Sequence, residues 1–236
     1  MEPQPFTIFG TSHIITLVII LCLAIFFPRA YRNKSVSQKE NVAKILAISI
    51  IALELIKPFI WHSLDYPWIR LIPIHMCSLS GFFIGIFLLT KKRIFFEIAF
   101  FWGIGGGINA LITPDVTLTF PDPAYLLFFI GHGLLIVNIG YACIALSNRP
   151  TFDSVKNGIF FTLTVLPIIY IINLLLGPPA NYWFLGTKPT EGQSIMDFFP
   201  DPPLHIPLLI IIGAFLFLLI YAPYWVHDRF KNPNAE

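Results

Sequence analysis

The amino-acid sequence predicts an all-α membrane protein, a single bundle of about seven transmembrane helices, and three observations point to this. Of the 236 residues, 56% are hydrophobic and only 12% are charged, whereas soluble domains carry about 25% charged residues. The mean hydropathy of +0.75 agrees with that composition. Seven apolar segments of 17 to 24 residues follow one another along the chain, and a helix needs about 20 residues to cross the hydrocarbon core of a bilayer.

These segments give the expected helices in chain order. They cover residues 12–28, 42–62, 69–90, 94–112, 125–147, 158–177 and 203–226. Arg70 and Glu97 lie near the ends of their segments, and the second segment alone carries charges at depth, Glu54 and Lys57. We expect residues 1–236 to form one membrane-embedded domain, because no part has the composition of an independent soluble domain.

The distribution of basic residues predicts how the helices cross the membrane. Twelve of the 15 Lys and Arg residues lie on alternate connections, after the first, third, fifth and seventh segments: Arg29, Arg32, Lys34, Lys39, Lys44, Lys91, Lys92, Arg93, Arg149, Lys156, Arg229 and Lys231. Basic residues next to transmembrane helices favour the cytoplasmic side. We therefore expect a multi-pass protein of the cell membrane with its N-terminus outside and its C-terminus in the cytoplasm.

Charge and cysteine content exclude several other classes of protein. The net charge is +2, which gives no reason to expect a nucleic-acid partner. The three cysteines, Cys22, Cys77 and Cys143, form neither an even-numbered framework nor a Cys-x-x-Cys pair. Neither a disulfide scaffold nor a zinc site is expected on that basis, and the sequence indicates no cofactor and no metal.

Polar side chains gather at one level of the predicted bundle. With a rise of about 1.5 Å per residue, Cys77 lies roughly 12 Å and His132 roughly 10 Å below the outer ends of their helices. The same outer half contains Glu54, Lys57, Asn109, Asn173 and His205. Polar groups inside a membrane face the bundle interior or a wet cavity. We therefore expect a cavity that opens toward the outer leaflet.

The third segment carries the cysteine at that level. On an unbroken helix, Arg70 shares a face with Cys77 because the two are seven residues apart. His75 is two residues from Cys77, about 200° around the helix, so a His-x-Cys metal pair is not favoured unless Pro73 loosens the turn. Cys77 is either a nucleophile among polar groups or a small buried hydrophobe. The other two cysteines lie away from the polar level and fit only the second interpretation.

Three further features have a structural interpretation beside a functional one. Glu54 and Lys57 can neutralise one another as an intramembrane strut, or Glu54 can orient a catalytic group while Lys57 holds a lipid phosphate. His132, which has a glycine on either side, is a candidate base or a hydrogen-bonding group in helix packing. The stretch GIGGGIN at residues 103–109 favours a close helix contact over a ligand loop.

The chain contains the stretches FGTSHI, RLIPIHMCSL, FFIGHGLL and GPPANYWFLGTKP, and the resemblance that they carry extends over nearly the whole chain, from His13 to His205. At these stretches the chain resembles the YwaF-like bacterial integral membrane proteins, which are grouped with the acyltransferase family of transmembrane protein 164. That family's acyltransferase pairs a cysteine nucleophile with a histidine, and the matching positions here are Cys77 and His132. The family stretch Asn-Tyr-x-Phe-Leu-x-x-Lys-Pro appears as Asn181, Tyr182, Phe184, Leu185, Lys188 and Pro189.

The resemblance implies a membrane-embedded acyltransferase or transacylase with membrane lipids as acyl donor and acceptor. A thiolate attacks an ester, the sulfur holds the acyl group, and a second lipid hydroxyl takes it while a histidine moves the protons. A nearby imidazole or a cation such as Arg70 is needed to favour the thiolate. His75 and His13 are alternative bases near the outer side. The expected supporting residues are Glu54, Lys57, Asn109, Asn173, Asn181, Tyr182 and Lys188.

Two non-catalytic functions stay open at this point. A lipid or small-solute transporter would use the same polar cavity, although the chain shows no inverted repeat of the kind that supports alternating access. A sensor or assembly scaffold would bind a partner through the outer loops at residues 113–124 and 178–202. A close approach of Cys77 to His132 favours the enzyme over both, since neither alternative needs it.

Overall fold

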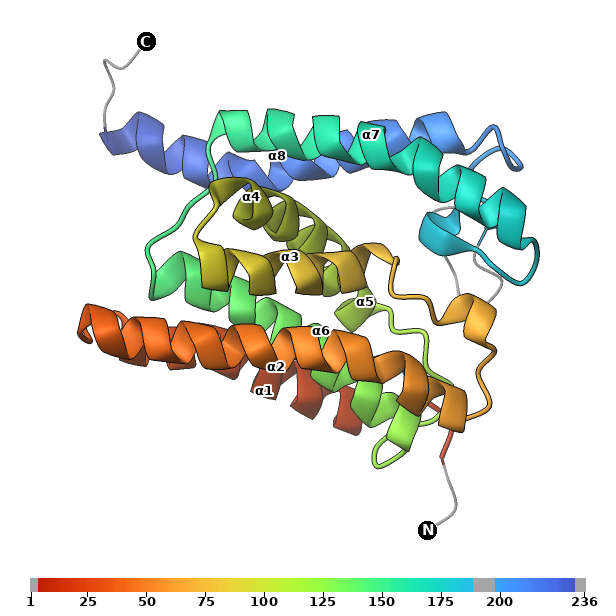
Figure 1. Cartoon of the computed structure of the whole chain (residues 1–236), viewed down its shortest axis with the longest axis horizontal. Coiled ribbons are helices and arrows are strands. Elements are labelled where there is room, and N and C mark those ends of the chain that lie inside the picture. Colours follow the sequence, from red (N-terminus) through yellow and green to blue (C-terminus); the bar gives the residue numbers. More distant parts are fainter. Residues whose placement is uncertain (1–3, 189–197, 232–236) are drawn as a thin grey trace.

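The computed structural model describes residues 4–188 and 198–231, and there the chain is all-α apart from one isolated bridge between Pro5 and Leu118. The described residues form seven helical rods, which run broadly along one direction (Figure 1). They are α1 (Thr11–Tyr31), α2 (Val36–Ser63), α3 (Met76–Thr90), the continuous rod of α4 (Arg93–Trp102), the π-helix η2 (Gly103–Gly107) and α5 (Ile108–Ile112), α6 (Pro123–Ile144), α7 (Phe152–Leu176) and α8 (Ile206–Lys231). Two 3-10 turns, η1 (Trp68–Arg70) and η3 (Tyr182–Phe184), lie in the connections.

Five of these rods are long and apolar enough to cross a membrane: α1, the rod from Arg93 to Ile112, α6, α7 and α8. The other two are α2, which carries charges along its 28 residues, and α3, which has only 15 residues. Large apolar side chains stay exposed on the outer helices; Leu175 and Phe160 of α7 are 81% and 73% exposed. Such exposure is unfavourable in water and favourable in lipid. The chain is a polytopic membrane protein, and the full count of seven spans stays a prediction.

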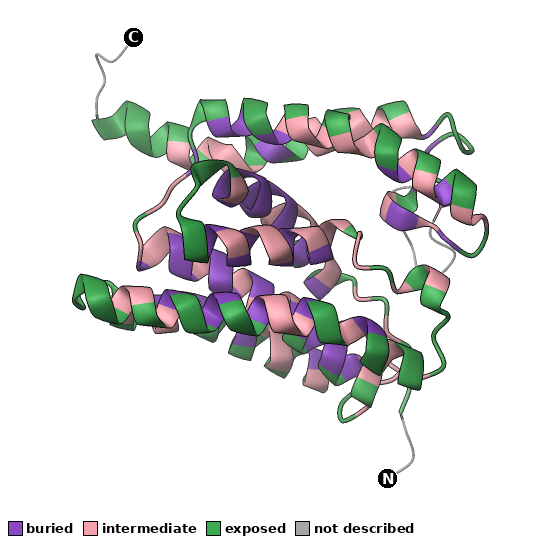
Figure 2. Cartoon of the chain, in the orientation of Figure 1, coloured by how far each residue is buried: buried purple, intermediate pink, exposed green. Residues whose placement is uncertain are grey.

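The core lies on the inner helices. Figure 2 shows buried residues concentrated on α3, α4 and α6, whereas α7 and α8 are mostly exposed or half-buried. The helix α3 packs against α2, α4 and α6, and η2 packs against α3, α6 and α8. A side chain on the inner face of α3 is therefore surrounded by helices.

Local sequence explains where several helices begin and end. Ser35 caps α2 and Thr151 caps α7, each in a capping box with the residue three positions later. The carboxylate of Asp122 accepts hydrogen bonds from the first backbone amides of α6, and Pro123 follows at the start of the helix. At the other end of α7 the chain turns at Gly177, whose φ of 67° favours glycine.

The third helix is shorter than the sequence predicts, and this corrects one of our expectations. It begins at Met76 rather than at residue 69, because η1 and a turn that contains Pro73 precede it. Proline removes a backbone donor and disfavours helical geometry at the residue before it. Arg70 and Cys77 therefore do not share a helix face, and the angular argument against a His75–Cys77 approach does not hold.

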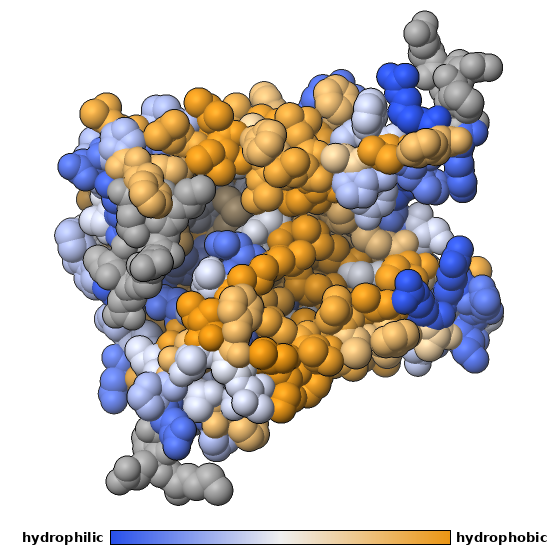
Figure 3. Space-filling model, turned by 180° about the vertical axis from the view of Figure 1, so that it is seen from behind, coloured by the Kyte–Doolittle hydropathy of each residue, from blue (hydrophilic) through white to orange (hydrophobic). Residues whose placement is uncertain are grey.

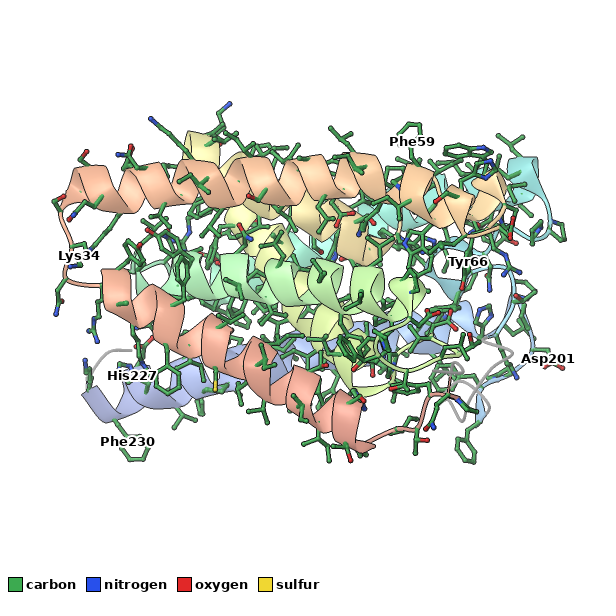
Figure 4. All side chains as sticks on the ribbon, turned by 90° about the horizontal axis from the view of Figure 1, so that it is seen from below. Lys34, Phe59, Tyr66, Asp201, His227 and Phe230 are labelled. Carbon is green, nitrogen blue, oxygen red and sulfur yellow. The ribbon has the colours of Figure 1, made fainter. Side chains whose placement is uncertain are left out.

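The basic connections meet at one end of the bundle, as their alternate spacing predicts. Lys91 interacts electrostatically with Glu40 and Lys44 of α2, while Arg93 donates a hydrogen bond to the carbonyl of Arg149. Figure 4 places Lys34, His227 and Phe230 at this end, which we call the basic end, and Tyr66 and Asp201 at the opposite end, the Tyr66 end. Which end faces the cytoplasm stays a prediction.

Candidate active site

A buried ion pair on α2 lies at the centre of the candidate site. Nζ of Lys57 is 2.6 Å from Oε1 of Glu54, and the two side chains are 16% and 2% exposed. The Glu54 side chain lies against Gly81 of α3, where an added Cβ would be 2.9 Å from its Cγ. The Lys57 ammonium lies against Gly131 of α6, where an added Cβ would be 3.6 Å from Nζ. The two glycines thus make room for a charged pair between three helices.

Cys77 occupies the first turn of α3 and faces the π-helix. Its Sγ would lie 3.3 Å from a Cβ placed on Gly106, so the absence of a side chain there allows the close approach. The thiol is free and partly exposed, and it makes no hydrogen bond to any residue in the described ranges. Lys57 and Glu54 both act on it electrostatically. Cys77 therefore lies in the polar cluster, although it is the second residue of α3 and not, as the sequence predicted, roughly 12 Å below the start of that helix.

His132 has one ring nitrogen committed and one available. Its Nδ1 is 2.9 Å from the carbonyl oxygen of Phe128, one turn earlier on α6. A carbonyl can only accept, so Nδ1 carries the proton and the neutral ring has its lone pair on Nε2. Nε2 makes no hydrogen bond within residues 4–188 and 198–231, and the side chain is partly exposed. This is the tautomer that a general base needs.

Cys77 and His132 share a neighbour rather than a hydrogen bond. The Lys57 ammonium acts electrostatically on both, and His75 acts on His132. The three helices that carry them, α2, α3 and α6, pack against one another. No hydrogen bond joins Cys77 to His132 in the described part of the chain. The structure thus brings the predicted nucleophile and base into one cluster around Lys57, and their direct approach stays a prediction.

The other two candidate bases, His13 and His75, differ in how many of their ring nitrogens form hydrogen bonds. In His13 both nitrogens are occupied, since Nδ1 accepts from the amide of Phe9 and Nε2 donates to the carbonyl of Leu111. His13 is also only 1% exposed, so it holds the start of α1 against α5. His75 stands at the N-cap position of α3 without a side-chain capping bond, donates from Nε2 to the carbonyl of Arg70 at 3.3 Å, and leaves a lone pair on Nδ1.

Several predicted supporting residues shape the loop that follows α7. Asn173 accepts from the Tyr182 amide and donates to the Tyr182 carbonyl, at 2.8 and 2.9 Å. Asn181 bonds to the backbone of Gly186 and Thr187. Lys188 donates to the carbonyl of Phe199 and pairs with Asp201. These three residues order the loop, and nothing in the described ranges brings them against Cys77. Pro189 lies outside the described residues.

That loop is fixed to the segment that leads into Cys77. The Tyr182 hydroxyl donates to the carbonyl of Ile69, and the Trp183 indole donates to the carbonyl of Ile74 at 2.9 Å. The Tyr182 ring also packs on His75, with centroids 4.6 Å apart. Residues 69–75 are therefore held from outside by an aromatic loop. Sequence reasoning missed Trp183, because the family stretch leaves its position unspecified.

Within the described ranges, the side chains of two predicted residues, Arg70 and Asn109, are exposed and make no hydrogen bond or ion pair. Arg70 contributes to the cluster through its backbone carbonyl, which accepts from His75. Lys57 rather than Arg70 is the cation that acts on Cys77. His205 is buried and donates to the carbonyl of Phe184, so it belongs to the loop. In residues 4–188 and 198–231 there is no group of three or more His, Cys, Asp or Glu that could hold a metal ion.

Seen from behind, the molecule has hydrophilic surface inside a hollow bordered by apolar side chains, nearer the Tyr66 end than the basic end (Figure 3). In the described chain, His75 is exposed and both Cys77 and His132 keep accessible surface, although helices surround them. Polar groups that remain accessible inside an apolar bundle are typical of a functional cavity.

Comparison with known proteins gives the family. A protein of Treponema pallidum (strain Nichols), described as uncharacterized, is 24% identical over 231 residues, which cover 96% of this chain and 93% of that protein. No solved structure gives a significant match. The model of the TMEM164 family matches residues 8–221, and this range includes every element from α1 through most of α8. The chain therefore belongs to the TMEM164 family.

Proposed function

We propose that this protein is a membrane-embedded lipid acyltransferase or transacylase. An acyl chain passes through a thioester on Cys77, His132 moves the protons, and the site opens to the outer leaflet. The family membership supports this proposal, since Cys77 and His132 stand at the positions that resemble the family's cysteine and histidine. The polar cluster around Lys57, which contains both residues, supports it independently.

The tautomer of His132 is the observation that carries the proposal. With Nδ1–H donated to Phe128, the lone pair of Nε2 is left for a proton from another group. A histidine that served only helix packing would need no accessible second nitrogen. Here Nε2 is unbonded within the described ranges, in the same cluster as a thiol that also has no hydrogen-bond partner. A base and a nucleophile are what acyl transfer requires.

The proposed reaction has two balanced steps. In the first, Nε2 of His132 takes the thiol proton, Sγ of Cys77 forms a bond to the ester carbonyl carbon, the ester C–O bond breaks, and the departing lipid oxygen takes the proton from His132. In the second, the hydroxyl of an acceptor lipid gives its proton to Nε2 of His132 and its oxygen bonds to the thioester carbonyl carbon, the C–S bond breaks, and the departing sulfur takes the proton from His132. No oxidant, reductant or metal is required.

Membrane lipids are the proposed donor and acceptor. The cluster lies inside the bundle. Along the helices that carry it, the cluster is well separated in sequence from the connections at the basic end. With the basic end in the cytoplasm, the site faces the outer leaflet. A phospholipid already in that leaflet reaches such a site directly, whereas a soluble cytoplasmic acyl donor would have to cross the apolar half of the bundle.

The first prediction compares membrane lipids from cells that carry the wild-type chain, Cys77→Ala or Cys143→Ala. We expect the wild type and Cys143→Ala to give the same altered distribution of acyl chains among phospholipids and lysophospholipids, and Cys77→Ala to match cells without the protein. Quantitative lipid mass spectrometry measures this. A Cys77→Ala lipid profile equal to that of the wild type would favour a non-catalytic transporter or scaffold.

A further inference from the structure

The ion pair of Glu54 and Lys57 on α2 is oriented across the bundle, from α3 to α6. Its negative end, the Glu54 carboxylate, lies against Gly81 of α3, and its positive end, the Lys57 ammonium, lies against Gly131 of α6. Gly131 directly precedes His132. The positive end is therefore at the helix that supplies the proposed base, and the negative end is packed one turn beyond Cys77, beside Ser78.

The positive end acts on all three of the reactive groups. Lys57 and Glu54 both act on Cys77, in opposite directions. Lys57 acts on His75 and His132 as well. Asp115 also acts on His75, while η2, the helix on the other side of Cys77, consists of glycine and isoleucine.

We infer that Lys57 supplies the fixed positive charge of this site and that Glu54 is the positioning residue that holds it there. The Lys57 charge favours the thiolate form of Cys77 and stabilises the negative oxygen that forms when sulfur adds to an acyl ester. This inference deepens the acyl transfer proposed above and rests on it.

The chemistry needs such a charge. A thiol enclosed by apolar helices disfavours its charged form, and a neighbouring cation offsets that cost. Negative charge then moves from sulfur to the carbonyl oxygen in the tetrahedral intermediate, and a fixed cation close to both stabilises it without reorganisation. Lys57 keeps its protons throughout, because His132 carries out the proton transfers. Glu54 accepts from Lys57 at 2.6 Å and so restrains a flexible side chain to one position.

The second prediction concerns the rate at which iodoacetamide alkylates Cys77 at different pH values. We would measure it by intact-protein mass spectrometry in a Cys22→Ala/Cys143→Ala background, where Cys77 is the remaining cysteine. Lys57→Met should shift the rate profile to higher pH and slow alkylation about tenfold at pH 7.5, since an opposite charge at close range changes a titration by about one unit or more. Lys57→Arg should keep the profile close to that of the background protein.

A double variant distinguishes a Lys57 charge that acts on Cys77 from an ion pair that is only structural. Glu54→Gln/Lys57→Met removes both charges, so it leaves no unpaired ion inside the bundle. If the pair is a strut alone, the double variant recovers the background profile; if Lys57 acts on Cys77, the profile stays at high pH. The matched control is Lys156→Met, which breaks another i,i+3 pair, with Asp153, whose side chains are 61% and 77% exposed. Its alkylation profile should not change.

The inference is overturned if Cys77 is alkylated with the same rate profile against pH in Lys57→Met, or in the double variant, as in the Cys22→Ala/Cys143→Ala background protein. If Lys57→Met does not fold, the double variant and Lys57→Arg carry the test, and thermal unfolding identifies folded samples. Alkylation needs no lipid substrate, so its outcome is independent of lipid turnover. Unchanged lipids in Cys77→Ala would end the acyl-transfer proposal, while an unchanged alkylation profile would end this inference about Lys57.

Discussion

His13, His75 and His132 have different roles, and the hydrogen bonds of their ring nitrogens decide which role each one has. His13 uses both ring nitrogens and is a structural residue. His132 uses Nδ1, and His75 uses Nε2, so each keeps one lone pair. His75 lies in the turn before α3, where the loop after α7 packs on it. His132 lies within a helix, with Lys57 beside the residue before it. The rigid position of His132 is the better one for a base.

Depth along a helix was an incomplete guide to the cluster and gave none of its contacts. It grouped Cys77, Glu54, Lys57 and His132, but it placed Asn173 and His205 at the same level, and both belong to the loop after α7. It could not indicate that Asn173 would turn toward the Tyr182 backbone, since that bond joins a helix to an irregular loop nine residues later. Side-chain hydrogen bonds to loop backbone depend on the path of the loop, and the periodicity of the sequence does not predict that path.

At the scale of elements, glycines decide how closely the helices approach the site. In η2 an added Cβ would meet Leu216 of α8 at Gly105, the Cys77 sulfur at Gly106 and Ile136 of α6 at Gly107. The expected close helix contact at residues 103–109 is confirmed, and it involves three neighbouring helices. Successive residues point in different directions around a helix, so consecutive glycines face different partners. The sequence predicted the contact but not the π geometry.

The third prediction tests glycine packing between α1 and α6. An added Cβ on Gly140 would lie 2.6 Å from the backbone carbonyl oxygen of Ala24, and backbone cannot move aside as a side chain can. Gly140→Ala should therefore destabilise the folded protein by about 1–3 kcal/mol, measured by thermal unfolding in detergent. The control is Gly213→Ala on α8, where nothing lies within 4 Å. It should unfold at the same temperature or higher, because alanine favours helix. Equal unfolding of both variants would contradict the packing.

At the scale of the whole molecule, alternation of the basic residues predicted which connections meet. The contacts of Lys91 with α2 and of Arg93 with Arg149 confirm that these connections share one end. The beginning of α3 was not predicted, because the apolar run continues through residues 69–75 while Pro73 and the aromatic loop keep that segment out of the helix. Hydropathy gives the number and order of apolar segments, and tertiary contacts decide where a short one begins.

The fourth prediction fixes the orientation of the bundle. With the three native cysteines replaced, a cysteine at Thr117, an exposed position between α5 and α6, should react with a membrane-impermeant thiol reagent added to intact cells. A cysteine at Lys92, exposed at the basic end, should react only after the cells are opened. Reversed labelling would place the basic end outside and would move the proposed site to the cytoplasmic leaflet.

The fifth prediction tests the central claim, that an acyl group passes through Cys77, and a covalent measurement does so most directly. The purified protein would be incubated with a phospholipid of defined acyl chain and analysed by intact and peptide mass spectrometry. We expect a mass increase of one acyl group on the peptide that contains Cys77. It should be removed by neutral hydroxylamine, which cleaves thioesters, and be strongly reduced in His132→Ala. Acyl transfer between lipids that continues with no acyl group on Cys77, or that persists in Cys77→Ala, would contradict the account.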